Sequence, residues 1–102
     1  MRPIHVAHLD KHRPVLVLTR ELVRPHMTRV TVAPITGTIR GLSTEVLVGP
    51  ANGLDKPSVI SCDNIVTIPT DSLGRHVGYL LPTQELELST AICNAFDLEP
   101  WT

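Results

Sequence analysis

Hydrophobic and polar residues alternate in short runs through most of the chain, and turn-forming Gly, Pro, Asn and Asp residues separate the runs. Such runs predict β-strands. The expected strands cover 4–9, 13–19, 28–36, 43–48, 58–61, 65–68 and 75–81. The run 13–19 is continuously apolar, which is typical of a strand buried on both faces. Pro34 interrupts the next run, which predicts a bulge or a strand end beside a site.

The pattern changes from Thr83 onward, where apolar residues recur at helical spacing. These residues are Leu88, Ile92, Ala95 and Phe96. They predict a helix over about 83–96, with Thr83 as its N-cap. One helix after six or seven strands, without repeated strand–helix alternation, predicts a mainly β fold. We expect a small antiparallel barrel or sheet that the C-terminal helix closes.

Length and composition narrow the class of protein. The chain has 102 residues, which fits a single domain over 1–102. Its apolar runs are too short to span a bilayer, and no signal-peptide core follows the first residues, so a cytoplasmic protein is expected. Only three residues are aromatic, which excludes a base-stacking platform of several rings.

Charge is unevenly distributed along the chain, although the net charge is only −1. Residues 1–40 carry a net +5 and four of the five histidines, whereas residues 41–102 carry a net −6. This asymmetry is typical of a nucleic-acid surface built from the first part of the chain. Mutual neutralisation of the two parts after folding explains it equally well.

Metal and cofactor chemistry are not expected. Cys62 and Cys93 form no CxxC pair, so they are interpreted as buried free thiols. On a strand, the spacing of His5 and His8 directs them to opposite faces, and no cysteine or carboxylate cluster completes a zinc site with His12. Phosphate-binding glycine loops, GxSxG and HExxH are also absent from the sequence.

One group of residues suits phosphodiester chemistry. Arg13 directly precedes the buried strand, and Thr36 ends a later strand, with Thr38 and Arg40 behind it. A guanidinium with two parallel donors and a nearby hydroxyl form a natural cradle for a phosphodiester. From the spacing alone, a surface ion pair and a threonine in a turn explain the same residues more simply.

Three motifs in register resemble those of the MazF/PemK family of toxin endoribonucleases. His12–Leu18 resembles a strand motif of that family, and Val32–Thr36 resembles the following strand, which ends in Pro-x-Thr/Ser. Ser61–Ile68 resembles the third motif, an Asp-Gln pair ahead of a short strand. The order, the spacing and the terminal helix also agree, so the resemblance covers nearly the whole chain and is strongest to mycobacterial members.

The resemblance implies an SH3-like barrel of the CcdB/PemK type, with a C-terminal helix, that forms a homodimer. It also implies cleavage of single-stranded RNA without a metal, and inhibition by a MazE-like antitoxin whose disordered tail lies in the active-site groove. The residues it implies are Arg13 and Thr36 for catalysis, Arg40 with Thr38 for the RNA backbone, and Asp63 and Asn64 for the groove lining.

Three further points follow for the site. His12 is the better general base on chemical grounds, because arginine stays protonated, but contact of His12 with phosphate or solvent is an equal alternative. Lys56 is a further candidate for RNA contact. The chain departs from the family where Asn64 replaces the usual Gln and where the connection 10–12 is short.

Two other functions are compatible with the same architecture. A CcdB-like toxin binds DNA gyrase without enzymatic activity, and Trp101 near the C-terminus would suit an interaction anchor. The presence of Arg13 and Thr36 argues against that alternative, and cleavage of RNA by the purified protein would decide it. A peptide-binding adaptor requires an aromatic-lined groove, which three aromatic residues do not provide.

Overall fold

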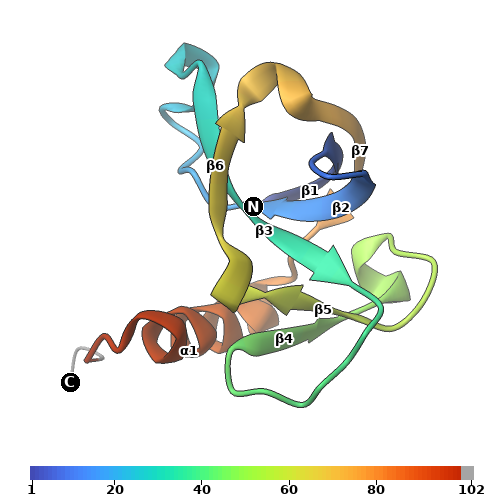
Figure 1. The fold of residues 1–102 in the computed structure, drawn as a ribbon, viewed down its shortest axis with the longest axis vertical. Coiled ribbons are helices and arrows are strands. Elements are labelled where there is room, and N and C mark those ends of the chain that lie inside the picture. Colours follow the sequence, from blue (N-terminus) through green and yellow to red (C-terminus); the bar gives the residue numbers. More distant parts are fainter. Residues whose placement is uncertain (100–102) are drawn as a thin grey trace.

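The computed structural model describes residues 1–99 and contains seven strands and one α-helix, in the expected order (Figure 1). The strands are β1 (Pro3–His8), β2 (His12–Val17), β3 (Arg29–Thr36), β4 (Glu45–Val48), β5 (Ser58–Ser61), β6 (Val66–Pro69) and β7 (Leu73–Tyr79), and the helix is α1 (Glu85–Phe96). Short 3₁₀ turns lie between them: η1 (Arg24–His26), η2 (Pro50–Asn52), η3 (Cys62–Asn64), η4 (Thr70–Ser72) and η5 (Pro82–Gln84). The predicted mainly β fold with a C-terminal helix is confirmed.

All strand pairs are antiparallel, in the order β4-β5-β3-β2-β1-β7, and β6 also pairs with β3. Within residues 1–99 the outer strands β4 and β7 do not pair with each other. The expected barrel is therefore not closed by hydrogen bonds. Figure 1 shows β3 as the long central strand that links the two parts of the sheet.

A bulge or a strand end was expected at Pro34, and the strand end is not observed, because β3 continues to Thr36 and changes partner around Pro34. On one edge, β3 pairs with β6 up to Val32 and with β5 from Ile35 onward. Pro34 lies in the gap between these partners, where its missing N–H costs no ladder hydrogen bond on that edge. On the other edge, Pro34 stays in register with Val15 of β2.

Strand alternation divides the apolar side chains between two cores. Leu16 and Ile35 belong to the larger core, which α1 covers, whereas Val15 and Val17 belong to a smaller core with Ile68 of β6. In β2 the consecutive residues Val15 to Val17 are buried, with at most 1% of any of them exposed, whereas His12 is exposed. The prediction of a strand buried on both faces is confirmed for this second half of β2.

The start and end of the helix differ from the expectation. Thr83 lies in η5 rather than at the N-cap, and Gln84 occupies the cap position without a capping side-chain bond. The Gln84 amide instead bonds the backbone N–H of Leu81 and the side chain of Asn52. Phe96 was expected in the apolar stripe but is 56% exposed, because it lies in the last turn beyond the sheet. Trp101 lies outside the described residues.

Both cysteines are free thiols, as expected, with Cys62 buried and Cys93 half-buried. Burial raises the pKa of the Cys62 thiol to about 11, and the neighbouring Asp63 carboxylate adds to the shift. In the described part of the chain, no helix is long and apolar enough to cross a membrane.

Candidate active site

The register of β2 and β3 directs Arg13 and Thr36 to the same side of the sheet. Val15 pairs with Pro34, and Leu16 pairs with Ala33. Extended by two residues, this register sets Arg13 opposite Thr36, on the face of the smaller core. The ladder between β2 and β3 ends at Val15 and Pro34, while on its other edge β3 continues with β5 as far as Thr36, which pairs with Val59. A pocket opens between the separating ends.

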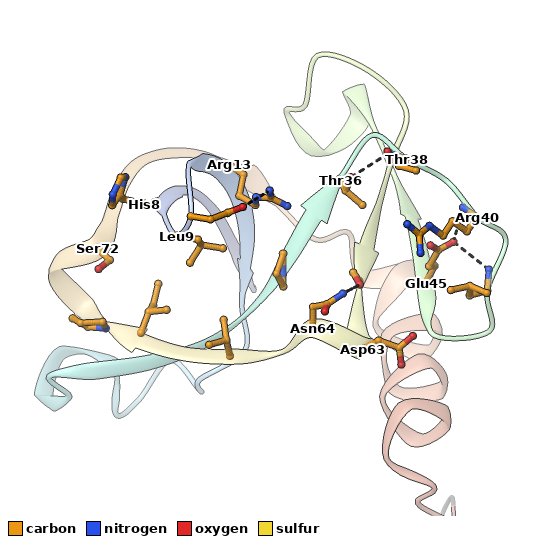
Figure 2. A pocket seen from close by; sticks show the side chains of 17 residues that line it. His8, Leu9, Arg13, Thr36, Thr38, Arg40, Glu45, Asp63, Asn64 and Ser72 are labelled. Atoms are coloured by element: carbon orange, nitrogen blue, oxygen red, sulfur yellow. Dashed lines mark hydrogen bonds and ion pairs between the residues drawn. The ribbon is translucent and has the colours of Figure 1, made fainter.

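This pocket has a volume of about 720 Å³ and brings together most of the predicted site residues (Figure 2). Six of the eight line it: Arg13, Thr36, Thr38, Arg40, Asp63 and Asn64. They come from β2, from the end of β3 and the loop after it, and from η3. Residues far apart in the sequence therefore converge on one cavity.

Arg13 is held on one wall of the pocket by a single ion pair. Its Nη2 lies 3.4 Å from Oδ2 of Asp10, and its side chain is only 25% exposed. The Nε atom is buried and has no hydrogen-bond partner among the described residues. Figure 2 shows the guanidinium extending toward the end of β3 that carries Thr36. Most of its donors are thus available to an anionic ligand.

The Thr36 hydroxyl faces the same cavity and keeps a free proton. Its Oγ1 accepts a hydrogen bond of 3.2 Å from the backbone N–H of Thr38. Because that contact uses a lone pair, the hydroxyl hydrogen remains free to be donated. Thr38 and Arg40 continue along the exposed loop between β3 and β4.

The opposite wall is formed by η3, whose polar side chains are fixed by their neighbours. Thr44 donates a 2.6 Å hydrogen bond from its hydroxyl to Oδ2 of Asp63. Asn64 donates from Nδ2 to Oγ of Ser61 at 2.8 Å. Oδ1 of Asn64 and Oδ1 of Asp63 take part in neither of these bonds and can accept further ones.

His12 and Lys56 are not among the residues that line this pocket. Successive residues of a strand point to opposite faces, so His12 and Arg13 diverge. The ring of His12 lies against that of His8, tilted by 57° with the ring centroids 4.7 Å apart, and it is His8 that lines the pocket. Lys56 lines a second cavity of about 290 Å³ on the other side of the end of β3.

The sequence-based analysis missed several lining residues, among them His8, Asp10 and Glu45. For His8 and Asp10 the signal was available, because both lie at the turn next to Arg13. Glu45 carried a weaker signal, a carboxylate four residues after a glycine in a predicted turn. Its role depends on how the loop folds back onto it.

The charge of the pocket lining is mixed, although the sequence separates basic and acidic residues between its two parts. Two arginines, Arg13 and Arg40, face three carboxylates, those of Asp10, Glu45 and Asp63. Within residues 1–99, no group of three or more His, Cys, Asp or Glu side chains is arranged to hold a metal ion. Positive charge is concentrated at two points of the pocket rather than spread along it.

Comparison with known proteins gives consistent matches over nearly the whole chain. The family model "PemK-like, MazF-like toxin of type II toxin-antitoxin system" matches residues 3–96. The chain is 68% identical over 99 residues to endoribonuclease MazF3 of Mycobacterium tuberculosis, covering 97% of this chain and 96% of the relative.

Solved structures agree with these sequence matches. The Mycobacterium tuberculosis toxin MazF-mt6 is 67% identical and superposes with a TM-score of 0.95, covering 98% of this chain and all of that one. A mycobacterial endoribonuclease in complex with its cognate antitoxin is 29% identical, with a TM-score of 0.85, over 98% of this chain and 95% of that one.

The fold, the pocket and these relatives define the class of the molecule as a small endoribonuclease toxin. The chain belongs to the family of PemK-like, MazF-like toxins of type II toxin–antitoxin systems. The resemblance inferred from the three sequence motifs is thereby confirmed.

Proposed function

We propose that this toxin cleaves single-stranded RNA at short specific sequences, without a metal ion, and thereby inhibits translation and growth in the cytoplasm. The observation that carries the proposal is the position of Arg13 and Thr36 at the separating ends of β2 and β3, on one pocket. An arginine and a hydroxyl in this arrangement can together donate hydrogen bonds to the oxygens of a phosphodiester.

The proposed reaction is attack of a ribose 2′-OH on the adjacent phosphorus. The bond between the 2′-oxygen and phosphorus forms as the bond to the 5′-oxygen breaks, leaving a 2′,3′-cyclic phosphate and a 5′-hydroxyl. The 2′-OH loses its proton to a base, and the departing 5′-oxygen takes up a proton. Because the nucleophile belongs to the substrate, the protein needs only to align it and to stabilise the crowded phosphorane.

Arg13 and Thr36 would each stabilise a different part of the transition state. The Arg13 guanidinium, with one nitrogen engaged by Asp10, would use its remaining donors to balance the negative charge that develops on the oxygens of the phosphorane. The Thr36 hydroxyl would donate its free hydrogen to a non-bridging oxygen. Both groups are held by strand backbone, so little reorganisation is required when the substrate binds.

Proton transfer is proposed for the histidine pair at the edge of the pocket. His8 lines the cavity, whereas His12 does not line it but contacts the ring of His8. Histidine exchanges protons near neutral pH, whereas arginine remains protonated. We therefore assign the exchange with substrate to His8 and retain His12, the candidate from the sequence, as the residue that orients it.

Base selection is proposed for the opposite wall. Because Asn64 donates one amide hydrogen to Ser61, its side chain is held in place, and its carbonyl oxygen would accept a hydrogen bond from the amino group of an unpaired base. Asp63 would act in the same way through its free oxygen. Arg40 and Thr38 would contact the RNA backbone. Asn64 is one methylene shorter than the glutamine usual in the family, which would leave more room for the base.

The proposed partners are a second copy of the chain and a MazE-like antitoxin. One relative was solved with its cognate antitoxin, and its fold superposes on nearly the whole of this chain. An acidic, disordered antitoxin tail would lie in the pocket and pair with Arg13 and Arg40, and so would exclude RNA. The homodimer is the assembly that the family resemblance implies.

The decisive experiment is incubation of the purified protein with a long unstructured RNA in excess EDTA, followed by mapping of the new ends. We expect discrete cuts that carry 5′-hydroxyl and cyclic phosphate groups. Arg13→Ala and Thr36→Val should each lower the cleavage rate by about 100-fold or more, as removal of a transition-state donor does. Arg20→Ala, an exposed arginine outside this pocket, is the matched control and should cleave normally.

Two results would contradict this proposal. Full activity of either Arg13→Ala or Thr36→Val would reject the assignment of the site. Failure of the folded wild-type protein to cut any RNA would favour the gyrase-binding alternative, which neither the family match nor the pocket currently supports.

A further inference from the structure

A single carboxylate oxygen organises the loop between β3 and β4. Oε1 of Glu45 accepts hydrogen bonds from three consecutive backbone N–H groups: those of Arg40 at 3.2 Å, Gly41 at 2.9 Å and Leu42 at 3.1 Å. Glu45 is the first residue of β4, so its backbone is anchored in the sheet. The loop is thereby tied to a rigid element at the point where it borders the pocket.

The conformation of the loop depends on its glycine. Gly41 has a φ of +73°, which is the left-handed region that residues other than glycine rarely adopt. Such a residue in a turn lets successive N–H groups converge on one anion. A Cβ built at Gly41 would meet no atom within 4 Å, so glycine is required there for its backbone conformation and not for space.

The loop presents Arg40 to the pocket with its guanidinium free. Arg40 lines the cavity and forms no ion pair within the described part of the chain. Figure 2 shows Glu45 next to Arg40, at the end of the pocket away from His8. Because the backbone N–H groups engage the Glu45 carboxylate, that carboxylate holds the Arg40 backbone while the Arg40 side chain stays available.

We propose that Glu45 is a positioning residue that fixes Arg40 for contact with a phosphate of the bound RNA, beyond the phosphate that is cleaved. This inference rests on the proposed ribonuclease function. It predicts an effect on RNA binding and little effect on the chemical step, because Arg13 and Thr36, and not Arg40, would contact the phosphate that is cleaved. A role of Glu45 in folding alone would leave the binding of RNA by the folded protein unchanged.

The test compares Glu45→Ala with Glu45→Gln, which keeps a carbonyl oxygen able to accept the same three bonds. In steady-state cleavage of a short RNA, Glu45→Ala should raise KM about tenfold, the loss expected for one charged contact, with kcat within about twofold. Glu45→Gln should stay within about threefold of the wild type in KM, because its neutral acceptor is weaker. Glu87→Ala, an exposed glutamate on α1, is the control and should leave both constants unchanged.

A double-mutant cycle links the effect to Arg40. If Glu45 acts by holding Arg40, Arg40→Ala should raise KM about as much as Glu45→Ala, and the double variant should show no further increase. Gly41→Ala offers a second way to disturb the loop without touching the carboxylate, and it should raise KM in the same direction. If Glu45→Ala does not fold, the KM values of Gly41→Ala and Glu45→Gln test the inference in its place.

The outcomes separate this inference from the function on which it rests. Loss of all cleavage by the wild-type protein would reject the function and the inference together. Normal cleavage by the wild type, with an unchanged KM in Glu45→Ala and Gly41→Ala, would reject the inference alone. Additive effects of Glu45→Ala and Arg40→Ala, or failure of Glu45→Gln to restore binding, would also overturn it.

Discussion

The side chains that border the pocket differ in how firmly the structure holds them. Arg13 has one long ion pair and a buried Nε without a partner, whereas Asp63 and Asn64 are each fixed by a short hydrogen bond. A buried donor without a partner is unfavourable in the free protein. Arg13 is thus the least firmly held of these three side chains.

The histidine pair leads to a prediction about pH. Because His8 lines the pocket and His12 lies outside it, His8→Ala should slow cleavage and remove the acidic limb of its pH–rate profile. His12→Ala should keep that limb and have a smaller effect on the rate. Single-turnover cleavage measured from pH 5 to pH 8 would check this. The opposite order of effects would return the proton transfer to His12.

Cys62 leads to a prediction about stability at alkaline pH. Burial raises its thiol pKa from 9.0 to about 11, so the folded protein keeps the proton at pH values at which the unfolded chain loses it. The free energy of unfolding should therefore fall as pH rises from about 9 to about 11, by at most about 1.4 kcal/mol per pH unit from this group. Urea titrations at several pH values should show a flatter decline for Cys62→Ala; an equal decline would exclude Cys62 as its source.

At the scale of elements, one buried asparagine joins three parts of the fold. Asn52 in η2 donates from Nδ2 to the backbone carbonyl of Tyr79 at 3.0 Å and to Oε1 of Gln84 at 2.7 Å, and it accepts from the N–H of Gly49 at 3.0 Å. It links the β4–β5 connection to β7 and to the start of α1. Backbones are close enough here that a Cβ at Gly78 would lie 2.0 Å from the Asn52 carbonyl oxygen.

Removal of this amide should destabilise the fold. Asn52→Ala leaves several buried polar groups unsatisfied, so we expect a loss of about 2–3 kcal/mol in the free energy of unfolding. Asn94→Ala removes one exposed hydrogen bond to Ser43 and should cost less than about 1 kcal/mol. Equilibrium urea denaturation compares the two variants. Equal losses would show that Asn52 has no special structural role.

At the scale of the whole molecule, folding mixes charges that are separate in the sequence. The basic first part supplies Arg13 and Arg40 to the pocket, but the acidic second part supplies Glu45 and Asp63 to the same lining. Of the two explanations offered for the charge asymmetry, this mixed lining agrees with mutual neutralisation of the two parts in the pocket, and two separate cations remain there. RNA binding should then depend on a few specific phosphate contacts rather than on a broad positive field.

The salt dependence of binding tests this view. For a single-stranded RNA with a 2′-deoxy residue at the cleavage position, two phosphate contacts predict a slope of about −1.4 for log affinity against log salt concentration. Arg40→Ala should make that slope shallower by about 0.7, whereas Lys56→Ala should leave it unchanged because Lys56 lines the other cavity. Fluorescence anisotropy over a range of KCl concentrations measures both. A much steeper slope would show that further cations contact the RNA.

Local patterns predicted the secondary structure well because they depend on neighbouring residues. The strand at 58–61 has the expected bounds, and the others shift by a few residues. The predictions of Thr83 as N-cap and of Phe96 in the buried stripe were wrong for tertiary reasons. Asn52 forms a hydrogen bond with Gln84, which takes the N-cap position, and Phe96 at the end of α1 is exposed. The residues near Thr83 in the sequence do not include Asn52, which forms the hydrogen bond with Gln84, so the local pattern could not predict this N-cap.

The sequence by itself determined the mainly β class, the buried strand β2 and the family, because period, composition and motif spacing are properties of the chain. Six of the eight candidate site residues were also placed in one pocket as the motifs implied. Only the tertiary structure decided that the barrel stays open, that β3 changes partners at Pro34 and that His8 rather than His12 faces the cavity. Strand pairing and side-chain direction arise from contacts between distant segments, so they could be observed only after the chain was folded.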